Sequence, residues 1–175
     1  TWTAEDIPSQ EGRLALVTGA NSGLGLATIQ ALAARQATVI LACRSSRKAE
    51  AAQQQLQDQG LSRLELLELD LADLSSVQRA AESVRDRYGH LDLLINNAGV
   101  MAPPRRTTVQ GHELQFGVNH LGHQALTQAL LPLMENRPDA RVVTVTSGAQ
   151  YFGRIHWNDP NWEQRYERYG AYGQS

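Results

Sequence analysis

The stretch that decides the fold is LALVTGANSGLG at residues 14–25, where an apolar run passes directly into a glycine-rich loop. Gly19, Gly23 and Gly25 lie between this run and a helix-like stretch at 23–35. In a dinucleotide site, one glycine allows a sharp turn, another leaves room for the pyrophosphate, and a third lets the helix pack closely. The free N–H groups at the start of the helix then face the phosphates. The stretch therefore predicts a strand, a phosphate-binding loop and a helix, with an ordinary glycine-rich turn as the alternative.

Apolar runs and amphipathic stretches alternate along the rest of the chain. The runs read as strands because they are apolar almost throughout, which is typical of strands buried on both faces of a parallel sheet. The predicted strands are 13–20, 37–44, 64–70, 91–99 and 140–147, and the predicted helices are 23–35, 46–59, 73–88 and 111–134. This order predicts a doubly wound α/β sheet with right-handed crossovers, a Rossmann fold.

Length and composition fit one dinucleotide-binding domain at 13–175, preceded by a lead-in at 1–12 that contains one capped helical turn. The net charge of −2 gives no general attraction to nucleic acid, and no apolar run reaches the roughly 18 residues of a membrane span. The single cysteine, Cys43, cannot form an internal disulfide, so a reducing cytoplasm is expected. His120 and His123 lie three residues apart, but no further ligand completes a metal site.

The glycine spacing Gly-x-x-x-Gly-x-Gly, preceded by Thr18, resembles the short-chain dehydrogenase/reductase family. The resemblance continues in order through Asp70, NNAG at 96–99, Asn119 and Ser147. The segments ACRS (42–45), GVMAPP (99–104) and ELQFGVNHLGH (113–123) are similar to the branch that contains retinol-dehydrogenase-like proteins and related carbonyl reductases. The resemblance covers residues 13–175 and implies the Rossmann fold together with a nicotinamide cofactor.

The resemblance implies that cofactor-binding residues lie at successive strand ends. Those in the first loop are Gly19, Asn21, Ser22, Gly23, Leu24 and Gly25, and those further along are Arg44, Asp70, Leu71, Asn97, Ala98 and Gly99. Asp70 would accept a hydrogen bond from the adenine, although it could instead cap the next helix. The backbone at 97–99 would pass close to the adenosine ribose, and Asn96 would tie neighbouring strands together.

Arg44 follows the second predicted strand, where the residue type indicates which cofactor is preferred. An acidic residue there would bind the ribose 2′-hydroxyl of NAD, whereas an arginine can pair with the 2′-phosphate of NADP. A solvated surface arginine is the alternative. The sequence favours NADPH over NADH.

The resemblance also implies the catalytic groups: a serine that holds the substrate oxygen, a tyrosine that exchanges the proton, and an asparagine that holds a water. Ser147 and Asn119 occupy the first and last of these roles. Tyr166, Tyr169 and Tyr172 are candidates for the tyrosine, and the insertion typical of this branch selects Tyr172. The family's lysine would fall at position 176. We therefore expect the sequence to be the N-terminal portion of a longer chain, cut within the catalytic helix and inactive on its own.

The predicted function is hydride transfer between NADP(H) and a small carbonyl or alcohol substrate, whose identity the sequence leaves open. Members of the family that the chain resembles pair their subunits through long helices beside the sheet, and the 111–134 stretch has the length and apolar face to do so. The resemblance therefore implies a homodimer or homotetramer of the intact protein. A dinucleotide-binding module without catalysis, such as a sensor, is the main alternative. A methyltransferase-like Rossmann domain is disfavoured by the glycine spacing, by Arg44 and by the pair Ser147 and Tyr172.

Overall fold

The computed structural model describes all residues 1–175 and contains one parallel sheet of five strands. The strands are β1 (Leu14–Thr18), β2 (Thr38–Cys43), β3 (Leu64–Glu68), β4 (Leu93–Asn96) and β5 (Arg141–Thr144), and their order in the sheet is β3-β2-β1-β4-β5. All four pairings are parallel. The predicted doubly wound sheet is confirmed.

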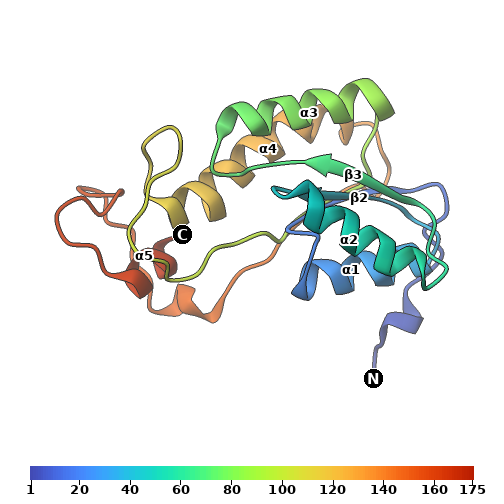
Figure 1. Ribbon diagram of the computed structural model, residues 1–175, viewed down its shortest axis with the longest axis horizontal. Helices are drawn as coiled ribbons and strands as arrows, with labels where there is room; N and C mark the ends of the chain where they lie inside the picture. Colours follow the sequence, from blue (N-terminus) through green and yellow to red (C-terminus); the bar gives the residue numbers. More distant parts are fainter.

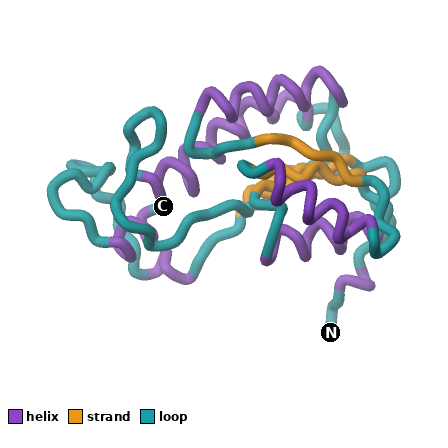
Figure 2. The backbone as a smooth tube through the Cα atoms, in the orientation of Figure 1, coloured by secondary structure: helices purple, strands orange, loops and turns teal.

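Helices cover both faces of this sheet, as Figure 1 shows. The helices α1 (Gly23–Ala34) and α2 (Ser46–Gln57) lie on one face, and α3 (Leu74–Tyr88) and α4 (His123–Leu130) lie on the other. Short helical turns are η1 (Ala4–Asp6), η3 (Leu131–Leu133) and η4 (Gly148–Tyr151). The last helix, α5 (Arg168–Gln174), follows a long loop and lies beyond the sheet at the left of the tube in Figure 2.

The central strand β1 shows how the sheet builds two cores. All five of its residues are buried. Because successive side chains point to opposite faces, Leu14 and Leu16 pack with α3 and α4, while Ala15 and Val17 pack with α1 and α2. Burial on both faces explains why this run carries almost no polar side chain.

Strand β5 departs from the expected burial. The sequence predicts a strand buried on both faces, but all four residues of β5 are exposed, including Val142 and Val143 at 40% and 45%. The strand pairs only with β4 and forms one edge of the sheet. An apolar run alone does not reveal whether helices and a further strand cover it, so this prediction was wrong.

The predicted helix at 111–134 is divided into three parts. Gly111 has a left-handed φ of 85°, which is incompatible with a helix start, so the helical region begins later. A π-helix, η2 (Phe116–Gly122), then leads into α4, and η3 completes the segment. A π-helical turn inserts an extra residue into the repeat and is frequent at functional sites. Regular spacing of apolar residues cannot reveal such a turn.

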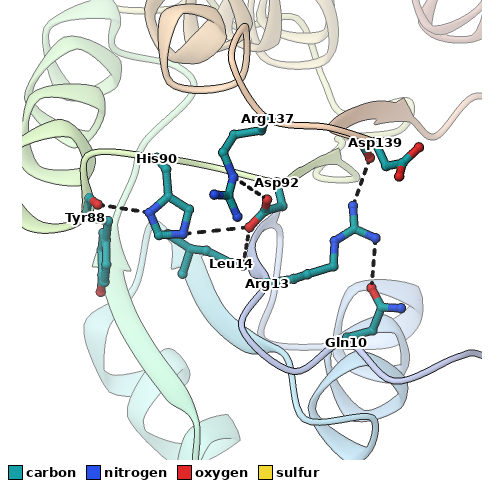
Figure 3. A network of polar contacts seen from close by, with 8 residues as sticks. All are labelled: Gln10, Arg13, Leu14, Tyr88, His90, Asp92, Arg137 and Asp139. Carbon is teal, nitrogen blue, oxygen red and sulfur yellow. Dashed lines mark hydrogen bonds and ion pairs between the residues drawn. The ribbon is translucent and has the colours of Figure 1, made fainter.

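An ion pair between the buried Asp92 and the partly exposed Arg137 joins the amino ends of three strands (Figure 3). Asp92, whose side chain is 3% exposed, accepts hydrogen bonds from the amide of Leu14 at 2.8 Å and from Nε of Arg137 at 2.8 Å. His90 lies 3.8 Å from the same carboxylate. Burial favours a raised pKa for Asp92, but the hydrogen bonds from Arg137 and Leu14 outweigh it and hold the pKa below its usual value. The contact pins β1, β4 and the segment before β5 together.

We predict that Asp92→Asn lowers the free energy of unfolding by roughly 2–3 kcal/mol at pH 7, because hydrogen bonds to a charged group are lost. The lowered pKa stabilises the fold above the unfolded-state pKa of about 3.9, and this contribution disappears as the pH falls below it. Urea unfolding of the variant should therefore vary less between pH 5 and pH 3 than that of the parent. Asp139→Asn is the control, since Asp139 is exposed and 4.0 Å from Arg141. Equal losses in both variants would contradict the prediction.

Candidate active site at the carboxyl edge of the sheet

The loop after β1 requires glycine at two positions. Gly19 has a φ of 66°, and a Cβ there would lie 2.8 Å from Cα of Ala98. At Gly25 a Cβ would press on the carbonyl oxygen of Gly19. The loop is therefore folded tightly on itself and on the segment after β4, with no space for larger residues at these two points.

The start of α1 faces outward with free hydrogen-bond donors. Ser22 is the N-cap residue, but its side chain makes no capping hydrogen bond. The amides of Ser22, Gly23 and Leu24 donate to no backbone atom. Gly23 has a left-handed φ of 56° and open space where a Cβ would point, and Asn21 lies just before it, half-buried. Such unsatisfied amides at a helix N-terminus fit the phosphates of a dinucleotide.

Arg44 and Asp70 occupy the ends of the next two strands. The amide of Gly19 donates to Ala42 at 3.0 Å, which brings the end of β2 against the glycine loop, and Arg44 follows there. Arg44 is exposed and forms no ion pair. Asp70, followed by the buried Leu71, accepts a hydrogen bond from the amide of Ala72 at 2.9 Å.

The alternative reading of Asp70 as a helix cap is wrong. Asp73 is the N-cap of α3, since its side chain accepts from the amide of Ser75 at 3.0 Å. The hydrogen bond to Ala72 uses Oδ1 of Asp70, and Oδ2 has no protein partner. Asp70 thus lies at the carboxyl edge of the sheet, and its Oδ2 is free to accept a hydrogen bond from a ligand.

The NNAG segment is tied to β1 through Thr18. The amides of Asn97 and Ala98 both donate to Oγ1 of Thr18 at 2.9 Å, and Nδ2 of Asn97 donates to the Thr18 carbonyl at 2.8 Å. Asn96 instead donates to the hydroxyl of Thr127 on α4 at 3.0 Å. The side chain that joins neighbouring strands is therefore Asn97, and the expectation for Asn96 was wrong.

A cleft of about 330 Å³ opens beyond the ends of β4 and β5, between η2 and α5. Its walls include all three residues predicted to be catalytic, Asn119, Ser147 and Tyr172, together with the NNAG segment. Ser147 is half-buried, and its hydroxyl accepts from the amide of Ala149 at 3.2 Å. Residues from the glycine loop, Arg44 and Asp70 do not line this cleft, but they lie along the same edge of the sheet.

Asn119 joins three segments at the wall of this cleft. Its Oδ1 accepts from the amide of Val100 at 2.8 Å, while Nδ2 donates to the Val100 carbonyl at 3.0 Å and to Oγ of Ser175 at 2.9 Å. The side chain therefore pairs with both the amide and the carbonyl of Val100 in the loop after β4, as the backbone of a neighbouring strand would. Asn119 is therefore not an amide on a free helix surface.

The three tyrosines near the end of the chain have different surroundings. Tyr166 donates to the carbonyl of Pro103 at 3.0 Å and accepts from Nε2 of Gln115 at 3.0 Å. Burial and the nearby Glu113 carboxylate raise the pKa of Tyr166, which makes its phenolate harder to form near neutral pH. Tyr169 is 68% exposed, whereas Tyr172 is half-buried and lines the cleft.

The family model for short chain dehydrogenase matches residues 13–159. The chain belongs to the short-chain dehydrogenase family. Retinol dehydrogenase 13 of Homo sapiens is 42% identical over 166 residues, which cover 94% of this chain and 50% of that protein. A short-chain dehydrogenase/reductase of Armillaria gallica is 44% identical over 162 residues, covering 90% and 52%. The chain spans about half the length of the curated relatives it matches.

Solved structures of short-chain dehydrogenases and related proteins share the fold. An uncharacterized protein from Mycobacterium Paratuberculosis is 51% identical, with a TM-score of 0.88 over 99% of this chain and 61% of that chain. The active-site complex of Pseudomonas aeruginosa RhlG with NADP is 28% identical, with a TM-score of 0.72 over 94% and 62%.

This short-chain dehydrogenase also uses buried polar residues that sequence reasoning missed. Glu113 and Gln115 are fully buried. Gln115 accepts from the amide of Ala102 at 2.8 Å and donates to the carbonyl of Arg168 at 2.9 Å, and the amide of Glu113 donates to Asn161 at 3.0 Å. They hold the insertion and the start of α5 against the cleft. Polar residues in a helical pattern are ordinarily assigned to solvent, so no pattern marked them.

His120 and His123, two of the five histidines, make different contacts. His120 stacks on Phe116, with ring centroids 5.3 Å apart, and lines the cleft. His123 also borders the cleft, but its side chain is buried and contacts Thr18. No group of three His, Cys, Asp or Glu residues could hold a metal ion, and no helix is long and apolar enough to cross a membrane.

Proposed function

We propose that this short-chain dehydrogenase is an NADP(H)-dependent oxidoreductase that interconverts a carbonyl and an alcohol. The observation that carries the proposal is the meeting of Asn119, Ser147 and Tyr172 in one cleft, beside the loop with free amides at the start of α1. The relatives named retinol dehydrogenase and the RhlG complex with NADP support the same class of substrate and cofactor. When bound, the nicotinamide would supply or accept the hydride.

The chain's own residues would bind the cofactor at the edge of the sheet and handle the substrate oxygen in the cleft. The amides at 22–24 would hold the phosphates, Arg44 the 2′-phosphate and Asp70 the adenine. Ser147 would donate a hydrogen bond to the substrate oxygen, where charge develops. Tyr172 would give or take the proton at that oxygen, and Asn119 would hold the surrounding loop in place.

A tyrosine that acts near neutral pH needs a cation beside it, because a free phenol ionises only near pH 10. The single lysine of these 175 residues, Lys48, lies on α2 and does not line the cleft. This observation favours a non-catalytic dinucleotide-binding module as the second candidate for the chain 1–175 by itself. A basic side chain from elsewhere in the protein would restore the enzymatic role.

The buried, free Cys43 supports a reducing compartment, and we propose the cytoplasm.

We predict that the full-length protein binds NADPH more tightly than NADH, and that Arg44→Asp reverses this preference. The carboxylate removes a charged hydrogen bond and repels the 2′-phosphate, so the NADPH affinity should fall at least tenfold. Cofactor titration by fluorescence measures both affinities. Arg85→Asp, the same charge change at an exposed residue of α3, should leave them unchanged. Equal affinities of the unmodified protein for the two cofactors would refute the role of Arg44.

We predict that Tyr172→Phe in the full-length protein lowers kcat for carbonyl reduction with NADPH by a factor of roughly 100 or more, because the proton donor is lost. Tyr169→Phe should have little effect, since that side chain is exposed. The chain 1–175 alone should show no activity, because Tyr172 has no lysine near it. Undiminished turnover by the Tyr172→Phe variant, or turnover by the chain alone, would place the chemistry elsewhere.

We also propose that the full-length protein is a homodimer or homotetramer. The apolar residues Val118, Leu126 and Leu130 pack inside the molecule, so an interface on this segment would use its outer side, with Gln124, Gln128 and the 45% exposed Leu131. Sedimentation at micromolar concentration should show an assembly, which Leu131→Arg should weaken. A monomeric parent protein would overturn this prediction.

A further inference from the structure

Neighbouring groups use every hydrogen-bonding position of the Thr18 hydroxyl. A threonine hydroxyl offers one proton and two acceptor positions. The amides of Asn97 and Ala98, both at 2.9 Å, fill the two acceptor positions. The proton must then go to Nε2 of His123, which lies 2.8 Å away, in preference to the carbonyl of Ile95 at 3.5 Å.

This assignment fixes the state of the His123 ring. Because Nε2 accepts a proton from Thr18, the hydrogen of the neutral imidazole is on Nδ1. Nδ1 lies 3.0 Å from the backbone carbonyl of Asn119, which can only accept, so Nδ1 donates to it. A second proton on the ring would point at a hydroxyl with no free acceptor position. Burial of the 5% exposed side chain also lowers the pKa of His123.

The hydrogen bonds continue from Asn119 to the helix that carries Tyr172. Nδ2 of Asn119 donates to Oγ of Ser175 at 2.9 Å, and the Ser175 hydroxyl donates to the carbonyl of Tyr172 at 2.9 Å. Four hydrogen bonds thus form a series of contacts from Thr18 through His123, Asn119 and Ser175 to Tyr172. The His123 side chain spans the gap between β1 and the π-helix.

We propose that His123 is a positioning residue that couples the cofactor side of the site to its catalytic side. On the first side it orders the Thr18 hydroxyl and, through it, the Asn97 and Ala98 backbone. On the other side its Nδ1 donates to the backbone carbonyl of Asn119, and the Asn119 side chain in turn donates to Ser175 on the helix of Tyr172. This inference rests on the proposed function, because it assigns the two ends of the series to cofactor and substrate.

Two substitutions separate the two ends. Asparagine carries its amide near the place of the imidazole Nδ1, so His123→Asn can keep the bond to Asn119 but cannot reach Thr18. Glutamine places its amide near Nε2, so His123→Gln can accept from Thr18 but loses Asn119. In the full-length protein we expect His123→Asn to weaken NADPH binding about tenfold with kcat within about twofold. His123→Gln should show the reverse, with kcat about tenfold lower and NADPH binding within about twofold.

Thr18→Ser and Thr18→Val test the same link from its other end. Serine keeps the hydroxyl and should bind NADPH like the parent, while Thr18→Val should weaken binding at least as much as His123→Asn does, because it also removes the acceptor of the Asn97 and Ala98 amides. The double variant that combines Thr18→Val with His123→Asn should bind NADPH no more weakly than Thr18→Val alone, because the valine has already broken the link to His123. His90→Asn is the control, since His90 lies at the opposite edge of the sheet and should change neither quantity.

A ring nitrogen spectrum supplies a readout that needs neither cofactor nor activity. With ¹⁵N-labelled histidine, His123 should give a protonated Nδ1 and an unprotonated Nε2 at pH 7, and Thr18→Val should shift the Nε2 signal. The opposite tautomer, or a charged ring at pH 7, would overturn the proposal, as would equal losses of binding and kcat in both His123 variants. An unmodified protein that binds no nicotinamide cofactor but shows the expected tautomer would refute the proposed function and the coupling role, while leaving the hydrogen-bond assignment intact.

Discussion

The parallel pairing of β1 with β4 places the glycine loop beside the NNAG segment, although 78 residues separate Thr18 from Asn96 in sequence number. After β1 the chain crosses to β2 over one face of the sheet, and before β4 it crosses back over the other face. The helices on either side therefore diverge at this point, which leaves a crevice at the carboxyl edge. Gly19 and Gly25 let the glycine loop pack directly against the NNAG segment, and these two segments together form the base of the crevice. Every residue proposed to bind cofactor or substrate lies along this edge.

The two edges of the sheet use polar groups in opposite ways. At the amino edge, Arg137 and the amide of Leu14 donate hydrogen bonds to the carboxylate of Asp92, whose side chain is buried. At the carboxyl edge, the amides at 22–24 and one oxygen of Asp70 have no protein partner. A native protein tolerates such unpaired groups where water or a ligand can reach them. The contrast separates the end that holds the fold together from the end where binding is proposed.

Local patterns predicted most of this architecture, because a strand buried on both faces needs an apolar run and a phosphate loop needs glycine. The patterns failed where distant contacts decide the outcome. The exposure of β5 depends on what lies beside it, and the π-helix at 116–122 follows a loop whose start is set by the positive φ of Gly111. The roles of Gln115 and His123 depend on partners more than 50 residues away. The placement of Ser147 and Tyr172 in one cleft followed from the family resemblance, since spacing alone cannot bring the segment after β5 and helix α5 together.

The burial of the strands has a consequence for the order in which parts of the molecule open. Local opening costs most free energy where a segment is packed on all sides and least where it is exposed. In the chain 1–175, all of β1 is buried whereas β5 is exposed throughout, so amide hydrogens of this chain should exchange slowly in the strand before the glycine loop and quickly in the strand before Ser147. The two halves of the site thus rest on supports of unequal stiffness. The glycine loop, where dinucleotide binding is proposed, follows a fully buried strand, while the helix that carries Tyr172 is held by hydrogen bonds from Asn119 and Gln115.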